Sequence, residues 1–267
     1  MSKPLIVDIA SCGLSGPGLL EWQAARSILC GEQAYQTEDM EKPSVKHLPA
    51  RDRRRFTFAI ALAITTAMKA VTLEGKEQIP AVFACSGGDT DVINRLCTTL
   101  TLPGCPVSPQ QFVNSVHNAP AGYWSIAEEN YAPTMSLSAF DATFASGLLE
   151  AAVQIRSGCE RVLLIAYDVP APPPIWSFRP LSAPFAVALL LAAPNHDKAA
   201  MARLELELVR DQAETSLDVG DLESLRLGNP AARSLPLLQA LAGDQPQELV
   251  LPYLSPQSLG VCLTPNA

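Results

Sequence analysis

Short apolar runs alternate along the chain with segments whose apolar residues recur at helical spacing. The runs predict buried strands at residues 4–10, 80–84, 134–140, 161–167 and 185–192. The helical spacing predicts helices near residues 19–29, 56–71, 91–102, 118–128 and 141–157. Strands and helices that alternate at these spacings are typical of an α/β layered fold.

The pattern changes after Pro194. Leucines alternate with charged residues over residues 203–210, as in a half-exposed strand, and residues 211–229 are acidic and weakly patterned. The remaining residues predict a short helix at 231–242 and a closing hairpin formed by residues 248–254 and 258–263. We therefore expect one domain over residues 1–193 and a short C-terminal extension over residues 194–267 that packs on it.

The predicted strand at 134–140 meets the predicted helix at 141–157 directly, with Asp141 at the junction. Unpaired N–H groups and the positive end of the helix dipole favour an anion at such a point. A cysteine there would have a lowered pKa and would be a good nucleophile. The sequence leaves two interpretations of Asp141 open: a simple helix N-cap, or a residue at a functional position.

Two segments carry a family resemblance. Ser138-Ala139-Phe140-Asp141, with the helix through Glu150-Ala151, resembles the nucleophile segment of the β-ketoacyl synthases of the thiolase superfamily, where Ser-Thr-Ala-Cys precedes a helix of small residues. In this alignment, Asp141 stands at the position of the family's cysteine. Residues 108–126 contain Ser-Pro-x-x-Phe, then Ser-Val-His-Asn-Ala and Gly-Tyr, and are similar to the segment before the nucleophile strand in the shorter, N-terminal-half type of ketosynthase protein. The resemblance covers residues 1–193 and implies a thiolase-like layered fold, a single N-terminal-type half with an abbreviated C-terminal tail.

The resemblance also implies what is missing. The second half of a ketosynthase would bring two catalytic histidines and a lysine in recognisable motifs, and none of those motifs occurs. We therefore expect no catalytic residue and no intrinsic condensing activity, since thioester condensation needs both nucleophile and histidines. The expected role is that of a non-catalytic, chain-length-factor-like partner of a β-ketoacyl-ACP synthase in type II polyketide, aryl polyene or fatty acid-like biosynthesis.

In such pairs, the strand before the nucleophile position joins its counterpart across a heterodimer, and bulky residues of the partner close the acyl tunnel. The candidate tunnel and interface residues are Phe112, His117, Asn118, Tyr123, Trp124, Phe140 and Asp141. Ordinary core packing is the simpler interpretation of each aromatic residue taken alone.

Two other hypotheses each rest on a single feature of the sequence. The chain could be a stand-alone thioesterase or decarboxylase that uses Cys85, His117 or Asp141 on acyl thioesters. The cluster Arg51-Asp52-Arg53-Arg54-Arg55 is either a solvated helix start or a contact for an acidic acyl carrier protein.

Composition excludes several classes of partner and cofactor. The formal net charge of −8 argues against a nucleic-acid partner, and no run approaches the roughly 20 apolar residues that a membrane span needs. The seven cysteines show no zinc-type spacing, so we expect no metal and no cofactor. Their odd number, without an export signal, predicts reduced thiols and a cytoplasmic location.

Overall fold

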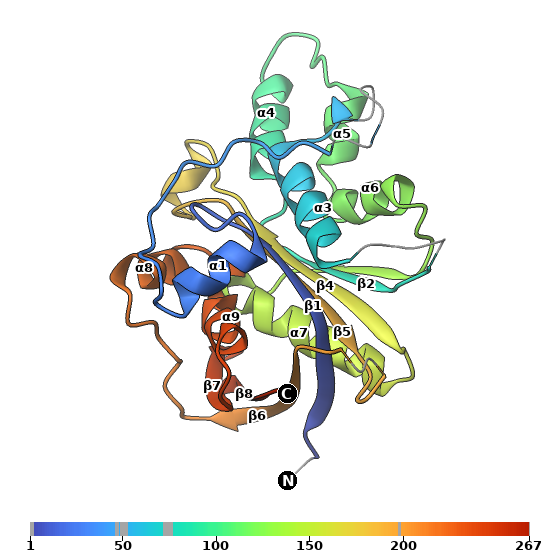
Figure 1. Cartoon of the computed structure of the whole chain (residues 1–267). Helices are drawn as coiled ribbons and strands as arrows, with labels where there is room; N and C mark the ends of the chain where they lie inside the picture. Colours follow the sequence, from blue (N-terminus) through green and yellow to red (C-terminus); the bar gives the residue numbers. More distant parts are fainter. Residues whose placement is uncertain (1–2, 46–47, 49–52, 72–76, 197–198, 267) are drawn as a thin grey trace.

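The computed structural model describes residues 3–45, 48, 53–71, 77–196 and 199–266, whose strands and helices alternate along the chain (Figure 1). The strands are β1 (Leu5–Ser15), β2 (Ala81–Ala84), β3 (Thr134–Leu137), β4 (Arg161–Asp168), β5 (Phe185–Ala192), β6 (Ala202–Arg210), β7 (Gln247–Pro252) and β8 (Gln257–Pro265). The α-helices are α1 (Trp22–Leu29), α3 (Phe58–Ala70), α4 (Thr90–Leu100), α5 (Pro109–Asn114), α6 (Ala119–Ala127), α7 (Thr143–Arg156), α8 (Gly220–Gly228) and α9 (Leu235–Ala242). Three short 3₁₀ helices are η1 (Phe140–Ala142), η2 (Ile175–Ser177) and η3 (Ala231–Ser234).

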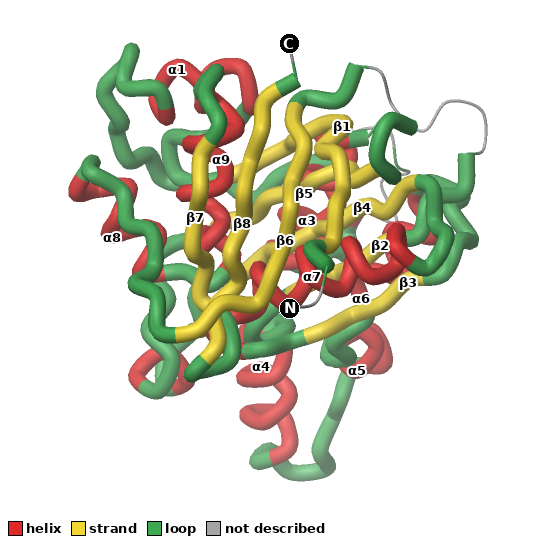
Figure 2. Tube along the Cα trace, turned by 90° about the horizontal axis from the view of Figure 1, so that it is seen from below, coloured by secondary structure: helices red, strands yellow, loops and turns green. Residues whose placement is uncertain are grey.

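The strands of the described residues form one sheet in the order β3-β2-β4-β5-β1-β6-β8-β7 (Figure 2). Strands β2, β3 and β4 run parallel, and every other neighbouring pair is antiparallel. The centre of this sheet is covered on both faces, which explains why β5 is an unbroken apolar run with every residue buried. The predicted α/β layered class is confirmed.

Helix α3 covers one face of the sheet, next to α6 (Figure 1). Its sequence is apolar nearly all round, and most of its side chains are buried, Ile60 and Ile64 among them, in one cluster with Phe83 of β2. The helix begins after Thr57, whose Oγ1 accepts a hydrogen bond from the N–H of Ile60 at 3.2 Å. The helix predicted at 56–71 is therefore confirmed within two residues.

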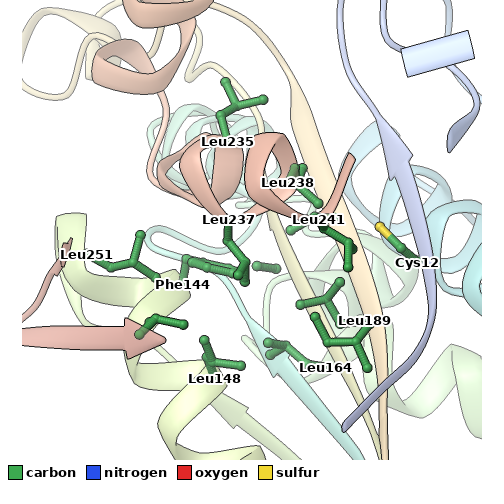
Figure 3. Packing of buried hydrophobic residues seen from close by; sticks show 14 of the residues in the cluster. Cys12, Phe144, Leu148, Leu164, Leu189, Leu235, Leu237, Leu238, Leu241 and Leu251 are labelled. Carbon is green, nitrogen blue, oxygen red and sulfur yellow. The ribbon is translucent and has the colours of Figure 1, made fainter. Parts of the chain in front are cut away.

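Helix α7 lies on the other face, beside α9 (Figure 3). Phe144 of α7 is fully buried in one cluster with Leu164 of β4, Leu237 of α9 and Leu251 of β7. An inner strand, β4, and an edge strand, β7, thus both contribute to the packing around α7. A Cβ atom on Gly147 would lie 2.8 Å from Leu164 Cδ1 and 2.9 Å from Ala84 Cβ, so only glycine lets α7 approach the sheet this closely.

The residues after 193 continue the same sheet. Strand β6 pairs with β1 on one side and with β8 on the other, and β7 forms the outer edge. The strand predicted at 203–210 and the hairpin predicted at 248–263 are confirmed, whereas helix α8 was not predicted. The division of the chain at residue 193 stays a prediction.

Two predicted boundaries are wrong. Strand β1 runs to Ser15, although the strand was expected to end at Ala10; the turn follows at Gly16 and Leu19, which exchange backbone hydrogen bonds of 2.8 and 3.0 Å. The strand expected over 134–140 ends at Leu137, because Phe140 has a φ of +54°, which is incompatible with a strand.

Candidate functional site

Strands β2, β3 and β4 end side by side, since Ala84 pairs with both Leu137 and Ala166. Polar residues lie at or just after each strand end and contact one another. Ser138 Oγ donates to the carbonyl oxygen of Ser86 at 2.8 Å, and Ser86 donates to Asp168 Oδ1 through its N–H at 2.8 Å and its Oγ at 2.7 Å. The carboxyl edge of the parallel strands therefore forms one connected polar cluster below the start of α7.

Asp141 lies between β3 and α7, within the 3₁₀ turn η1. The residue that caps α7 is Ala142, without a side-chain hydrogen bond, so the interpretation of Asp141 as the N-cap of this helix is wrong. Thr143 supplies the local hydrogen bonds instead: its Oγ1 accepts from the N–H of Ala139 at 3.0 Å and donates to the carbonyl of Phe140 at 2.6 Å. These bonds hold the backbone of Phe140 in its left-handed conformation.

The carboxylate of Asp141 is bound by an arginine from a distant loop. Arg179 Nη2 donates to Asp141 Oδ1 at 2.8 Å, and the guanidinium carbon of Arg179 lies 3.6 Å from the centroid of the Phe140 ring. The Arg179 side chain is 24% exposed and the Asp141 side chain 45% exposed. At the junction between β3 and α7, this chain therefore carries an ion pair.

Asp168 is the buried acid of the cluster. It is 2% exposed, and burial raises its pKa to about 6, although the hydrogen bonds from Ser86 favour the ionised form. Its second oxygen, Oδ2, is buried without a hydrogen-bond partner among the described residues. A carboxyl group in this state changes its charge near neutral pH.

Cys85 follows β2 and lies against Asp168, with 3.5 Å between Cys85 Sγ and Asp168 Oδ1. The thiol is 1% exposed, and burial, together with the nearby carboxylate, raises its pKa well above the usual range. Cys85 is therefore a protonated, buried thiol at neutral pH.

His117 stands over the same loop. Its Nε2 lies 3.0 Å from the carbonyl oxygen of Cys85, so Nε2 carries the proton and donates it in this contact. A Cβ atom on Gly88 would lie 3.5 Å from His117 Cδ2, which places the ring directly beside the loop. The contacts of His117 join α5 and α6 to the polar cluster.

The remaining predicted residues lie in different environments. Phe112 is 64% exposed on α5, whereas Trp124 is fully buried on α6 among the residues that pack on α3. Tyr123 accepts from Gln110 Nε2 at 2.7 Å and donates to Asn114 Oδ1 at 2.9 Å. Asn118 precedes α6 as expected, but its side chain makes no capping hydrogen bond.

The outer edge of β3 is unpaired among the described strands, because β3 ends the sheet order and pairs only with β2. Large apolar side chains are exposed next to it. Ile126 near the end of α6 is 72% exposed, Tyr131 is 77% exposed, and Met135 of β3 is 44% exposed. An open strand edge beside exposed apolar groups is a ready surface for another chain.

A pocket of about 670 Å³ opens between the start of α3, helices α4 and α5, and the loop after β4. Its charged lining residues are the basic Lys42, Arg54, Arg55 and Arg95 and the acidic Asp89 and Asp91. Part of the predicted arginine cluster thus lines a concave surface, while Arg51 and Asp52 of that cluster lie outside the described residues.

Sequence reasoning missed Arg179 and the burial of Asp168. Arg179 did carry a signal, since it is the single charged residue between Val169 and Pro184 in an apolar, proline-rich loop. In the described part of the chain, no helix has the length and apolarity to cross a membrane, and no three His, Cys, Asp or Glu residues gather as metal ligands would.

Several solved structures share this fold. A chain of the ketosynthase ApeO in complex with its chain length factor ApeC, from Xenorhabdus doucetiae, superimposes with a TM-score of 0.73 at 21% identity over 96% of this chain and 99% of that one. The ishigamide ketosynthase/chain length factor gives a TM-score of 0.75 at 11% identity over 100% of both chains. A complex of a type II polyketide synthase acyl carrier protein with its ketosynthase, AntDE:AntF, gives a TM-score of 0.74 at 15% identity. The match covers 99% of this chain and 100% of that one.

Identities this low establish the fold alone, and they confirm the thiolase-like, ketosynthase-type architecture. No curated protein matches the sequence. The family model described as β-ketoacyl synthase, N-terminal domain, matches residues 23–250, most of the chain. This protein is therefore a member of the β-ketoacyl synthase N-terminal domain family.

Proposed function

We propose that this chain is a non-catalytic, chain-length-factor-like partner of a β-ketoacyl-ACP synthase in type II polyketide or aryl polyene biosynthesis. The observation that carries the proposal is the ion pair of Asp141 with Arg179, 2.8 Å apart, at the nucleophile position. A carboxylate held by an arginine is a poor acyl acceptor, because it gives no stable thioester relay and its charge is already paired. The fold shared with chains of ketosynthase and chain length factor complexes supports the same role.

The positions of the described histidines also support a non-catalytic role. His117 donates to the carbonyl of Cys85, and His196 follows β5 at the end that pairs with Arg161. Strand β4 spans about 23 Å from Arg161 to Asp168, so His196 lies at the opposite end of the sheet from the polar cluster. His47 is outside the described residues. Neither described histidine is arranged to decarboxylate an extender unit at Asp141.

The open edge of β3 is the surface that we assign to the partner. A ketosynthase of the same fold would present its own edge strand, and pairing the two would cover the exposed Met135 and Tyr131. Phe140 and Asp141 follow β3 within four residues, so this pairing would bring them to the partner's acyl tunnel. Phe112, His117, Asn118, Tyr123 and Trp124 stay candidates for the surroundings of that tunnel.

An acyl carrier protein would reach this chain through the complex. Carrier proteins are the substrates of ketosynthases, and one of the structurally similar complexes contains one. The pocket lined by Lys42, Arg54, Arg55 and Arg95 brings basic groups together on a chain whose net charge is −8, and Arg95 pairs with Asp91 of the same pocket at 2.7 Å. We assign the acidic carrier protein to this pocket.

The alternative of a stand-alone thioesterase or decarboxylase has no support in these contacts. Cys85 is buried and protonated, and His117 uses its proton on a backbone carbonyl. Asp141 is bound to Arg179.

The test is co-expression with a full-length ketosynthase of the aryl polyene or type II polyketide class from the same genome. We expect a 1:1 complex whose condensing activity requires both chains, and an Asp141→Asn variant that keeps the complex and most of the flux. The proposal fails if this chain purifies as a stable monomer while the synthase works normally without it, or if this chain alone becomes acylated.

A further inference from the structure

One guanidinium group contacts two neighbouring residues of η1, the turn that follows β3. Arg179 pairs with Asp141 through Nη2, and its guanidinium carbon lies 3.6 Å from the centroid of the Phe140 ring. Arg179 comes from the loop between β4 and β5, 38 residues along the chain from Asp141. This contact is therefore a tertiary connection that local sequence did not impose.

The backbone at Phe140 is held by a local hydrogen bond, whereas its ring is not. Its φ of +54° lies in the left-handed region, which costs free energy for any residue with a Cβ atom. The hydrogen bond from Thr143 Oγ1 to the carbonyl of Phe140 holds the backbone, but it leaves the ring free to rotate. The ring is 63% exposed, so core packing does not hold it either. Among the described contacts, the ring is restrained by Arg179.

We propose that Arg179 is the positioning residue that fixes the Phe140 ring, with Asp141 as the counter-ion that keeps the guanidinium over that ring. The inference rests on the function proposed above, in which Phe140 faces the acyl chain that grows in the partner subunit. The length at which that chain stops then depends on Arg179, which does not touch the chain itself.

The chemistry of the pair accounts for the residue types. A guanidinium is planar, so it can stack on an aromatic face and still donate an in-plane hydrogen bond to a carboxylate. A lysine could pair with Asp141 but could not cover the ring in the same way. On this view, the aspartate at the nucleophile position acts through its charge.

The first experiment uses this chain alone and does not depend on any partner. The protein is labelled with 4-fluorophenylalanine, and the ¹⁹F resonance of Phe140 is assigned by its loss in Phe140→Leu. Arg179→Ala and Arg179→Lys should both move that resonance toward the position of solvent-exposed fluorophenylalanine, with the smaller shift in Arg179→Lys. An unmoved resonance in Arg179→Ala overturns the proposal.

Arg161→Ala is the matched control, because it removes an ion pair of similar exposure with Glu77, 2.6 Å apart, at the other end of β4. The Phe140 resonance should not move in this variant. Thermal unfolding of each variant separates a local change at the ring from a loss of the fold.

The second experiment measures product lengths made by the complex with its ketosynthase. Arg179→Ala should change the ratio of the longest normal product to longer ones by about two- to fivefold, the factor that a cation–π contact at a partly exposed site represents. Phe140→Ala should change it at least as much, and the double variant should equal Phe140→Ala, because Arg179 acts through the ring. Additive effects, or a wild-type ratio in Arg179→Ala, overturn the proposal.

The outcomes separate this inference from the function on which it rests. If no complex forms, the proposed function fails, whatever the ¹⁹F result. If the complex forms and Phe140→Ala changes product length but Arg179→Ala does not, the function stands and the positioning role of Arg179 is wrong.

Discussion

Asp168 shows how burial sets the chemistry of a single residue. The carboxyl group accepts two hydrogen bonds from Ser86, yet its pKa is raised to about 6, because burial removes the water that would stabilise its ionised form. Its second oxygen is buried without a partner among the described residues. The ionised form is therefore disfavoured in the folded chain relative to the unfolded chain. Folding favours the protonated acid, so the stability from this group is fully present below pH 3.8 and is lost as the pH rises through about 6.

The Asp168→Asn substitution should remove this pH dependence of the folding stability. The amide oxygen can still accept from Ser86, while the group no longer ionises. The variant should gain up to roughly 3 kcal/mol relative to wild type between pH 4 and pH 8, the value that the difference between the two pKa values represents. Urea unfolding across this range measures it, with Asp244→Asn on an exposed loop as the matched control. A difference between wild type and variant that stays constant with pH would contradict the assignment of this pKa.

At the scale of elements, β3 is the strand whose outer edge is open. It is four residues long, it pairs only with β2, and the N–H and C=O groups of alternate residues point outward. The Ala81 N–H donates to the carbonyl of Pro133, and the Cys85 N–H donates to that of Leu137, so the backbone groups of Thr134 point away from β2. Thr134 is exposed, at the first position of the strand.

Thr134→Pro should therefore block edge pairing without loss of a hydrogen bond to β2, since proline is tolerated at the first residue of an edge strand. We expect the variant chain to fold but to bind its ketosynthase at least about tenfold more weakly, which corresponds to about 1.4 kcal/mol. Thr134→Ala keeps the N–H and is the control. Equal binding of both variants in a co-purification or a titration would exclude β3 as the docking edge.

Helix α8 illustrates why one element escaped prediction. Its sequence is acidic with weak periodicity, and only Leu222 and Leu225 of its apolar side chains are buried. The helix is also held by Arg226, which is 4% exposed and pairs with both oxygens of Glu223 at 2.7 Å. Glu214, ahead of the helix, binds Arg226 at 3.3 Å and Arg233 at 3.4 Å. An ion network of this kind leaves no hydrophobic pattern in the sequence.

At the scale of the molecule, α7 is enclosed by parts of the chain that are far apart in sequence. Phe144 and Leu148 share one cluster with Leu164 and Leu189 of the central strands and with Leu237 of α9 (Figure 3). The residues after 193 thus cover one face of α7. One core of this kind makes independent folding of residues 1–193 unfavourable, because fully buried apolar side chains would be exposed.

A chain that ends at residue 193 tests this point. It lacks β6, β7, β8 and α9, so we expect it to aggregate or to lose cooperative unfolding, as seen by gel filtration and near-ultraviolet circular dichroism. In the full chain, Leu237→Ala should cost about 2–5 kcal/mol of unfolding free energy in a single transition, because it opens a cavity beside Phe144. A soluble, cooperatively folding 1–193 fragment would show instead that the predicted division at residue 193 is a domain boundary.

The sequence by itself determined the α/β class, most strands and helices, and the presence of Asp141 at the junction between a strand and a helix. These features follow from local periodicity and from motifs within about 20 residues, which need no knowledge of distant contacts. Only the tertiary structure decided that Arg179 binds Asp141, that Asp168 is buried beside Cys85, and that the C-terminal strands complete the sheet. Each of these depends on residues that folding brings together from 38 or more positions apart, and no local pattern records such a pairing.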